Sequence, residues 1–307
     1  MVIDAIRAGI RPVESIRKLL AEVIDYAGLF PPAKLSMSEA VVNYATYRNS
    51  NYSWMLGRFV APVARLDEFF NYAEDAIARD RDKHWRIAAV AGEDIQETIR
   101  IIKEFNYKNS GLALVDVLEV KANTVSKIEN TVNALPKGVT AYFEIANKEE
   151  LPELVSALAI RKQKAKIRTG GITNDQFPPA RQIIRFVRTC MAANVPFKAT
   201  AGLHHPIRCF RPLTYEPDSP SGMMHGFLNL LLMTGFARES YRVSLLEELM
   251  EEEFEEVFKF DELGVSWRNQ HQLNLTNLEL LRQRGMHSFG SCSFEEPIAD
   301  LEALGIL

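Results

Sequence analysis

Short apolar stretches alternate along the chain with longer stretches in which apolar residues recur every three or four positions. The long stretches, such as "DIQETIRIIKEFN" and "PPARQIIRFVRTCMAAN", have the spacing of amphipathic helices, and Ser36 and Asp94 stand where helix N-caps are expected. The short stretches have the length and composition of buried strands, and they cover residues 23–30, 53–62, 85–92, 111–122, 139–146, 164–171, 195–203 and 286–294.

The order of these elements predicts the fold. A strand followed by a helix, repeated many times, requires parallel strands joined by right-handed crossovers, and nearly continuous apolar strands are typical of a sheet that is buried on both faces. Eight such units favour a closed barrel over an open, doubly wound sheet. We therefore predict one α/β domain over residues 1–307, a (β/α)8 TIM-type barrel with an insertion at 206–285 between strands seven and eight.

The insertion has its own pattern. It predicts a helix at 222–237, an acidic helix at 244–257, a hairpin at 258–267 and a helix at 276–284. We assign the eighth strand to 286–294, and the pattern leaves 257–267 open as an alternative.

Composition limits the classes of protein to which this sequence could belong. The 307 residues are 47% hydrophobic and 25% charged, with a formal net charge of −4, so a nucleic-acid partner is not expected. No run of about 18 apolar residues and no signal-peptide pattern occurs, which predicts a cytoplasmic protein without a membrane span. Three scattered cysteines do not indicate a disulfide framework, and Cys292 is a candidate nucleophile. Whether the chain forms a homo-oligomer stays open.

Two lysines are the main chemical candidates. Active sites of such barrels lie at the C-terminal ends of the strands, and alternation within strands turns Lys166 and Lys198 into the barrel from neighbouring strands. Two ammonium groups that share a site lower each other's pKa, and a neutral lysine is a nucleophile toward carbonyl groups. The alternative is that the lysines bind an anion or that each pairs with a neighbouring carboxylate.

Carboxylates near these lysines are candidates for proton transfer. The alternation places Asp116 and Glu144 on the inner face, where they would act as acid and base. Glu119 and Lys121 have the other parity, so we expect them to point outward or to lie past the end of the strand.

An anionic substrate is indicated by Arg168, whose planar guanidinium suits a carboxylate or phosphate, unless it forms an ion pair with Glu144 instead. Backbone N–H groups of the residues that follow it add to this anion site. The full predicted substrate-binding set is Arg58, Arg168, Thr169, Gly170, Gly171, Thr200, His225 and Asn229.

His204 and His205 are predicted to act as a general acid or base near the same strand ends. The alternative is a metal site formed with His225. We assign no metal ligand and expect no cofactor. The loop "DYAGLFPPAK" is predicted to be structural, and in the alternative its Asp25, Tyr26 and Lys34 reach the substrate.

Four segments carry a family resemblance: "VDV" (115–117), "FEIANKEEL" (143–151), "AKIRTGG" (165–171) and "PFKATAG" (196–202). In this order they resemble strands four to seven of the deoxyribose-phosphate aldolase type of class I aldolase. The resemblance implies Asp116 in a proton relay, Lys166 as the imine-forming nucleophile and Lys198 as the neighbour that lowers its pKa. The chain departs from the family at Arg168, where the family has Ser, and at "AGLHH", which replaces a Gly-Gly phosphate-binding turn.

The predicted function is that of a Schiff-base-forming lyase that acts on a small oxo compound bearing a carboxylate or phosphate. One alternative is a metal-dependent lyase, isomerase or hydrolase centred on His204, His205 and His225. Another is a barrel that binds an anionic metabolite without turning it over.

Overall fold

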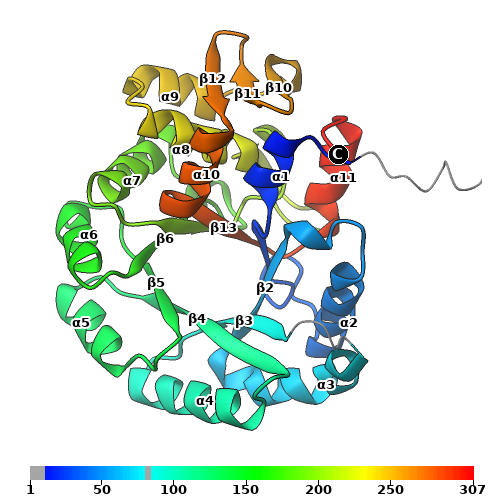
Figure 1. The fold of residues 1–307 in the computed structure, drawn as a ribbon, viewed down its shortest axis with the longest axis vertical. Helices are drawn as coiled ribbons and strands as arrows, with labels where there is room; N and C mark the ends of the chain where they lie inside the picture. The colour runs from blue at the N-terminus through cyan, green and yellow to red at the C-terminus, as the bar shows by residue number, and fades with distance from the viewer. Residues whose placement is uncertain (1–10, 80–83) are drawn as a thin grey trace, which may run out of the picture.

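The computed structural model describes residues 11–79 and 84–307 (Figure 1). Much of the N-terminal stretch in which we find no signal-peptide pattern lies in residues 1–10, outside this range. Eight parallel strands close into a barrel in the order β1-β13-β7-β6-β5-β4-β3-β2, which confirms the predicted (β/α)8 fold. The barrel strands are β1 Ile24–Tyr26, β2 Leu56–Pro62, β3 Trp85–Val90, β4 Ala113–Lys121, β5 Thr140–Glu144, β6 Lys164–Arg168, β7 Phe197–Thr200 and β13 Met286–Ser291.

Helices surround the barrel, and both predicted caps are confirmed. Ser36 accepts a hydrogen bond from the backbone N–H of Glu39 at 3.3 Å, and Asp94 accepts one from the N–H of Gln96 at 2.8 Å. Among the described residues, no helix is long and apolar enough to cross a lipid bilayer. The surrounding helices are α1 Glu14–Leu20, α2 Met37–Arg48, α3 Leu66–Arg79, α4 Ile95–Lys108, α5 Val125–Ala134, α6 Leu151–Ile160, α7 Ala180–Ala192 and α11 Glu295–Ala303.

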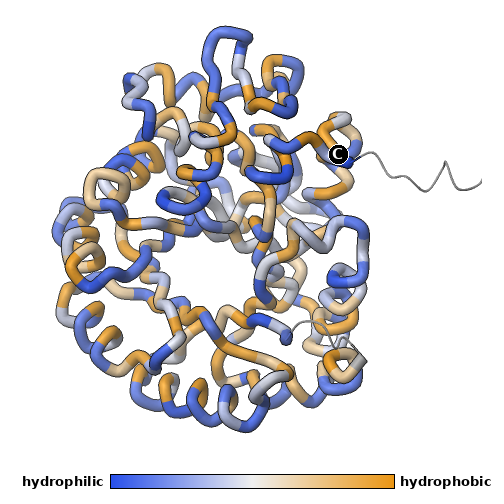
Figure 2. The backbone as a smooth tube through the Cα atoms, in the orientation of Figure 1, coloured by the Kyte–Doolittle hydropathy of each residue, from blue (hydrophilic) through white to orange (hydrophobic). Residues whose placement is uncertain are grey.

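Two hydrophobic clusters stabilise the barrel. The larger one lies between the strands and the helices, and Figure 2 shows hydrophobic and hydrophilic positions alternating along those helices. The smaller one consists of Val60, Ala88, Val117 and Tyr142, with Phe30 packed against it. Because successive side chains of a strand point to opposite faces, this smaller cluster marks the inner face of β2 to β5.

The insertion between β7 and β13 differs in part from its prediction. The expected helix at 222–237 is wrong at its start, which is a strand, and the acidic helix ends at Met250 rather than 257. Beyond it the chain turns, so that the buried carboxylate of Glu252 accepts hydrogen bonds from Trp267 at 3.1 Å and Arg268 at 3.0 Å. The elements are β8 Cys209–Pro212, β9 Ser221–Met224, α8 Phe227–Arg238, α9 Val243–Met250, β10 Phe258–Phe260, β11 Gly264–Trp267, β12 His271–Asn274 and α10 Leu275–Arg284.

The eighth barrel strand is β13, as assigned, and it pairs with β1 and β7. The predicted hairpin at 258–267 is confirmed as the antiparallel pair β10 and β11, which belongs to a separate three-stranded sheet with β12. Helix α8 is buried from Phe227 to Ala237, because it contacts α7, α9, α10 and β13. A helix that is apolar on all sides is typical of such a position.

A β-bulge in β4 changes which side chains face the barrel interior. Ile87 of β3 pairs with Val115, but Ala88 pairs with Val117, so Asp116 is an extra residue without its own partner. One inserted residue exchanges the two faces of the strand beyond it. The prediction that Glu119 points outward is therefore wrong: Glu119 shares the inner face with Val117 and is 4% exposed.

Candidate active site

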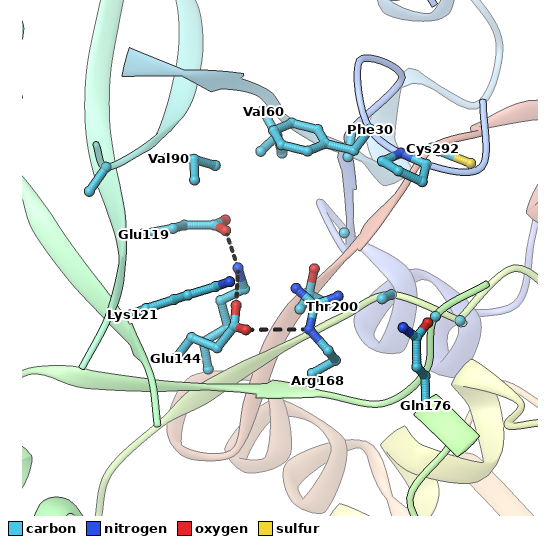
Figure 3. A pocket seen from close by; sticks show the side chains of 18 of the residues that line it. Phe30, Val60, Val90, Glu119, Lys121, Glu144, Arg168, Gln176, Thr200 and Cys292 are labelled. Atoms are coloured by element: carbon cyan, nitrogen blue, oxygen red, sulfur yellow. Dashed lines mark hydrogen bonds and ion pairs between the residues drawn. The ribbon is translucent and has the colours of Figure 1, made fainter. Parts of the chain in front are cut away.

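Two lysines and three carboxylates form a buried ion cluster toward the C-terminal ends of the strands. Figure 3 shows its cavity side, with Glu119 and Glu144. The Nζ of Lys198 lies 2.5 Å from Oδ2 of Asp25 and 2.6 Å from Oε1 of Glu119. The Nζ of Lys166 lies 2.7 Å from Oε2 of Glu119 and 2.9 Å from Oε2 of Glu144. The predicted inward direction of both lysines is confirmed. Each lysine also pairs with carboxylates, which was expected as the alternative to a nucleophilic role.

The strand register builds this cluster. Glu144, Lys166 and Lys198 are direct neighbours across β5, β6 and β7, so their side chains leave the sheet at one level. Glu119 of β4 pairs with Tyr142, two residues before Glu144, and it faces the same interior only because of the bulge. Its two oxygens bind one lysine each. One carboxylate therefore separates two ammonium groups that would otherwise repel each other.

The electrostatics differ from the prediction of mutually lowered lysine pKa values. Burial lowers the pKa of Lys198, but the carboxylates of Asp25 and Glu119 outweigh burial and raise it. Burial raises the pKa of Glu119, whereas the two lysines outweigh burial and lower it to about 2. The pKa of Glu144 is also lowered, since Lys166 and Arg168 outweigh the effect of burial. The lowered pKa expected for Lys198 is therefore wrong, because the expectation omitted its carboxylate partners.

Asp25 belongs to the buried cluster, although the sequence suggested it only as an alternative contact to the substrate. Its carboxylate also accepts hydrogen bonds from the Ser288 hydroxyl at 2.7 Å and from the Arg58 backbone N–H at 2.8 Å. The carboxylate lies so close to β2 that a Cβ at Gly57 would come within 2.4 Å of its Oδ1. Glycine at position 57 thus makes room for the partner of Lys198.

A cavity of about 740 Å³ lies over the cluster. Lys166 lines this cavity, whereas Lys198, which is 1% exposed, is not part of its lining. The size is within the range of small-molecule sites. Of the predicted site residues, those that line the cavity are Glu144, Lys166, Arg168, Gly171, Thr200 and His204.

Arg168 is half exposed at the cavity, and its Nε lies 3.3 Å from Oε1 of Glu144 (Figure 3). The ion pair expected as the alternative is therefore present. It engages only Nε, so the terminal nitrogens of the guanidinium are left to meet a bound anion.

Asp116 and Arg58 lie elsewhere, which corrects their predicted roles. Asp116 accepts hydrogen bonds from Arg58 Nε at 2.6 Å and Arg86 Nε at 3.0 Å, and Arg86 also binds Glu22, which precedes β1. This cluster is at the N-terminal end of the barrel, where polar networks stabilise the fold rather than act on substrate. Neither Asp116 nor Arg58 lines the cavity.

Thr169 and Gly170 are also outside the cavity lining. The Thr169 hydroxyl donates to the backbone oxygen of Ala201 at 2.8 Å. A Cβ at Gly170 would lie 2.8 Å from the Cα of Gly202, so this glycine allows two strand ends to approach each other. Both residues shape the site without facing it.

The three histidines of the metal hypothesis do not converge. His204 Nδ1 lies 3.0 Å from Glu296, and His205 Nδ1 lies 2.6 Å from Asp300. His225 Nε2 donates a hydrogen bond to the Pro178 carbonyl oxygen, 2.8 Å away, and burial lowers the pKa of His225. Throughout residues 11–79 and 84–307, no three His, Cys, Asp or Glu side chains are placed to hold a metal ion.

Asn229 was expected at the mouth of the site but is a structural link in the insertion. Its amide donates to the carbonyl oxygens of Leu249 at 2.8 Å and Glu252 at 2.9 Å, and its oxygen accepts from the Arg208 N–H. These bonds connect the start of α8 to the end of α9. Asn229 and His225 do not line the cavity.

A second series of hydrogen-bonded polar side chains lies beside the cavity, and it was not predicted from the sequence. Tyr215 Oη lies 3.1 Å from Oε2 of Glu296, the same oxygen that binds His204, and 3.7 Å from Sγ of Cys292. Burial raises the pKa of Cys292, so its thiol is a weak nucleophile. Tyr215 and Glu296 had no signal in the sequence, because they come from the insertion and from α11.

The fold and this cluster together define a TIM-barrel protein with a lysine and carboxylate site at the C-terminal ends of its strands, an arrangement typical of enzymes. Comparison with known proteins adds no family: no protein-family model and no curated protein matches the chain. The resemblance to class I aldolases stays a prediction.

Proposed function

We propose that the protein is an imine-forming lyase that acts on a small oxo compound with an anionic group, and that Lys166 is its nucleophile. The observation that carries the proposal is the position of Lys166: it is the lysine of the pair that lines the cavity, and it lies between two carboxylates. Lys198 is buried beneath it and acts as a positioning residue.

The two carboxylates have different tasks. Glu119 lies between two ammonium groups that keep it ionised, which makes it a poor proton acceptor. Glu144 has its side chain 15% exposed at the cavity, and it contacts Lys166 from the open side. Glu144 is therefore the base that removes the proton from Lys166 when a carbonyl compound enters.

The step is balanced in protons and charge. The neutral amine of Lys166 adds to the carbonyl carbon, and a proton moves from nitrogen to oxygen to give a carbinolamine. Glu144 then returns its proton to the hydroxyl group, which leaves as water while the C=N bond forms. The iminium carries the same charge as the original ammonium, so the ion pair with Glu119 is lost while the nitrogen is neutral and is restored when the iminium forms.

His204 is the proposed second acid and base. Glu296 binds its Nδ1, and no hydrogen bond within residues 11–79 and 84–307 engages its Nε2. Because His204 lines the cavity, this free nitrogen is available to a bound substrate. Cleavage of a carbon–carbon bond beside an iminium needs such a group to accept the proton of a hydroxyl.

Borohydride trapping followed by intact-mass measurement tests the proposal. Pyruvate, phenylpyruvate, acetaldehyde and glyceraldehyde 3-phosphate would each be added with borohydride, and at least one should leave a reduced adduct on the wild-type protein. Lys166→Arg keeps the charge between Glu119 and Glu144 but cannot form an imine, so it should gain no adduct.

Lys127→Arg is the matched control, because Lys127 is another lysine at the cavity and has no part in the proposed binding of substrate. It should be trapped as fully as the wild type. Equal labelling of Lys166→Arg would overturn the role of Lys166. Saturable binding of these compounds with no adduct on the wild type would instead favour the non-catalytic barrel.

A further inference from the structure

The cavity has one apolar wall. Phe30, Pro31 and Pro32 come from the loop after β1, and Val60 and Val90 come from β2 and β3. Phe30 and Val90 pack on the inner hydrophobic cluster, which holds this wall in place. These side chains offer no hydrogen-bond donor or acceptor, so a ligand's hydroxyl groups placed against them would lose their bonds to water.

The opposite wall is charged. Figure 3 shows Phe30 and Val60 on one side of the pocket and Glu144 and Arg168 across from them. Four cationic side chains and three carboxylates line the cavity, an excess of one positive charge in a protein whose net charge is −4. Arg168 and the exposed Lys121 lie on this wall at the ends of β6 and β4, and Lys166 lies two residues before Arg168 on β6.

We infer that the ligand of this cavity is an amphiphilic anion: a compound with a carboxylate at one end and an aryl or branched alkyl group at the other. The carboxylate meets Arg168 and Lys121, and the apolar group meets Phe30, Val60 and Val90. The inference rests on the proposed function in placing the ligand's carbonyl group between these ends, at Lys166. A polyhydroxylated sugar phosphate does not match the apolar wall.

Calorimetric titration of the wild-type protein with three probes tests the ligand class. The probes are 3-phenylpropanoate, propanoate and inorganic phosphate, none of which has a carbonyl group that could form an imine. We expect 3-phenylpropanoate to bind at least about tenfold more tightly than the other two, because its ring loses water contact on the apolar wall. Equal or tighter binding of phosphate or propanoate would overturn the inference.

A variant locates the binding. Phe30→Ala should weaken the binding of 3-phenylpropanoate by about tenfold and leave that of propanoate within about twofold. Ile160→Ala is the matched control, since Ile160 is 79% exposed at the end of α6, and it should leave both affinities unchanged. If Phe30→Ala binds 3-phenylpropanoate as the wild type does, the apolar wall is not the site.

The outcomes separate this inference from the proposed function. Preference for 3-phenylpropanoate without borohydride trapping would support the ligand class and overturn the imine mechanism alone. Trapping at Lys166 without that preference would support the mechanism and overturn the ligand class alone.

Discussion

The barrel interior contains two ion clusters, one at each end, and they differ in their cations. At the C-terminal end, Lys166 and Lys198 share the carboxylate of Glu119 below a cavity. At the N-terminal end, Asp116 joins Arg58 and Arg86, and none of the three lines the cavity.

The difference indicates that the type of cation, lysine or arginine, matches the proposed role of each cluster. An arginine keeps its charge in proteins, and its planar fork binds a carboxylate through two bonds, as Arg58 binds Asp116 at 2.6 and 2.8 Å. A lysine can lose its proton and react. The cluster below the cavity is built on Lys166 and Lys198, with Arg168 at its open edge, and the cluster at the other end is built on Arg58 and Arg86.

Removal of Lys198 should have the largest effect on stability. In Lys198→Met, the buried carboxylates of Asp25 and Glu119 lose their shared cation, which should lower the free energy of unfolding by about 3–5 kcal/mol. Urea denaturation measures this loss. Lys121→Met removes an exposed lysine at the same cavity and should cost less than about 0.5 kcal/mol. A loss below about 1 kcal/mol for Lys198→Met would mean that the cluster does not depend on this lysine.

Lowering the pH should reduce the free energy of unfolding in two steps, one from His287 and one from Glu119. Burial and the nearby Lys164 lower the pKa of His287, which accepts or donates at the Tyr142 hydroxyl 2.7 Å away, from 6.5 to about 4. The unfolded chain therefore binds more protons than the folded one as the pH falls from 6.5 toward 4, and stability should drop by about 2 kcal/mol there. The pKa of Glu119 is lowered from 4.5 to about 2, so stability should drop by about 3 kcal/mol more as the pH falls through that range.

Urea midpoints measured from pH 7 to pH 2 would resolve these two steps. His287→Asn should remove the first step and keep the second. Glu119→Gln should keep the first step and remove the second. Stability that stays constant between pH 6.5 and 4 in the wild type would contradict the assignment to His287.

Asp116→Asn should have the smallest effect and no effect on chemistry. Loss of the charge that pairs with Arg58 and Arg86 should cost about 1–2 kcal/mol, because Arg86 is partly exposed and its charge is screened by water. Borohydride trapping at Lys166 should stay at the wild-type level. Loss of trapping in Asp116→Asn would restore Asp116 to the proton relay that the aldolase resemblance implies.

Much of the architecture was predictable, since it depends on local patterns. The apolar strands, the helical spacing and the caps at Ser36 and Asp94 all lie within short windows of the chain. The inward direction of Lys166 and Lys198 follows from simple alternation, because β6 and β7 are short and regular. Strand β4 is longer, with nine residues, and its simple alternation fails at the bulge.

The composition of the site was less predictable, because its partners are far apart in the sequence. Asp25 and Lys198 are separated by 173 positions, and they meet only because β1 and β7 both pair with β13 when the barrel closes. His204 and His205 are adjacent in the sequence, yet each turns to a different carboxylate of α11. No local window contains these contacts.

The sequence by itself determined that the chain forms an eight-stranded parallel barrel and that two lysines enter it from neighbouring strands, since periodicity and alternation are properties of the local backbone. Only the tertiary structure decided which carboxylates meet those lysines. The register between β3 and β4 leaves Asp116 as the extra residue, which sends Asp116 to the arginines and Glu119 to the lysines. Such a register depends on how a whole strand packs against its neighbours, so no single strand encodes it.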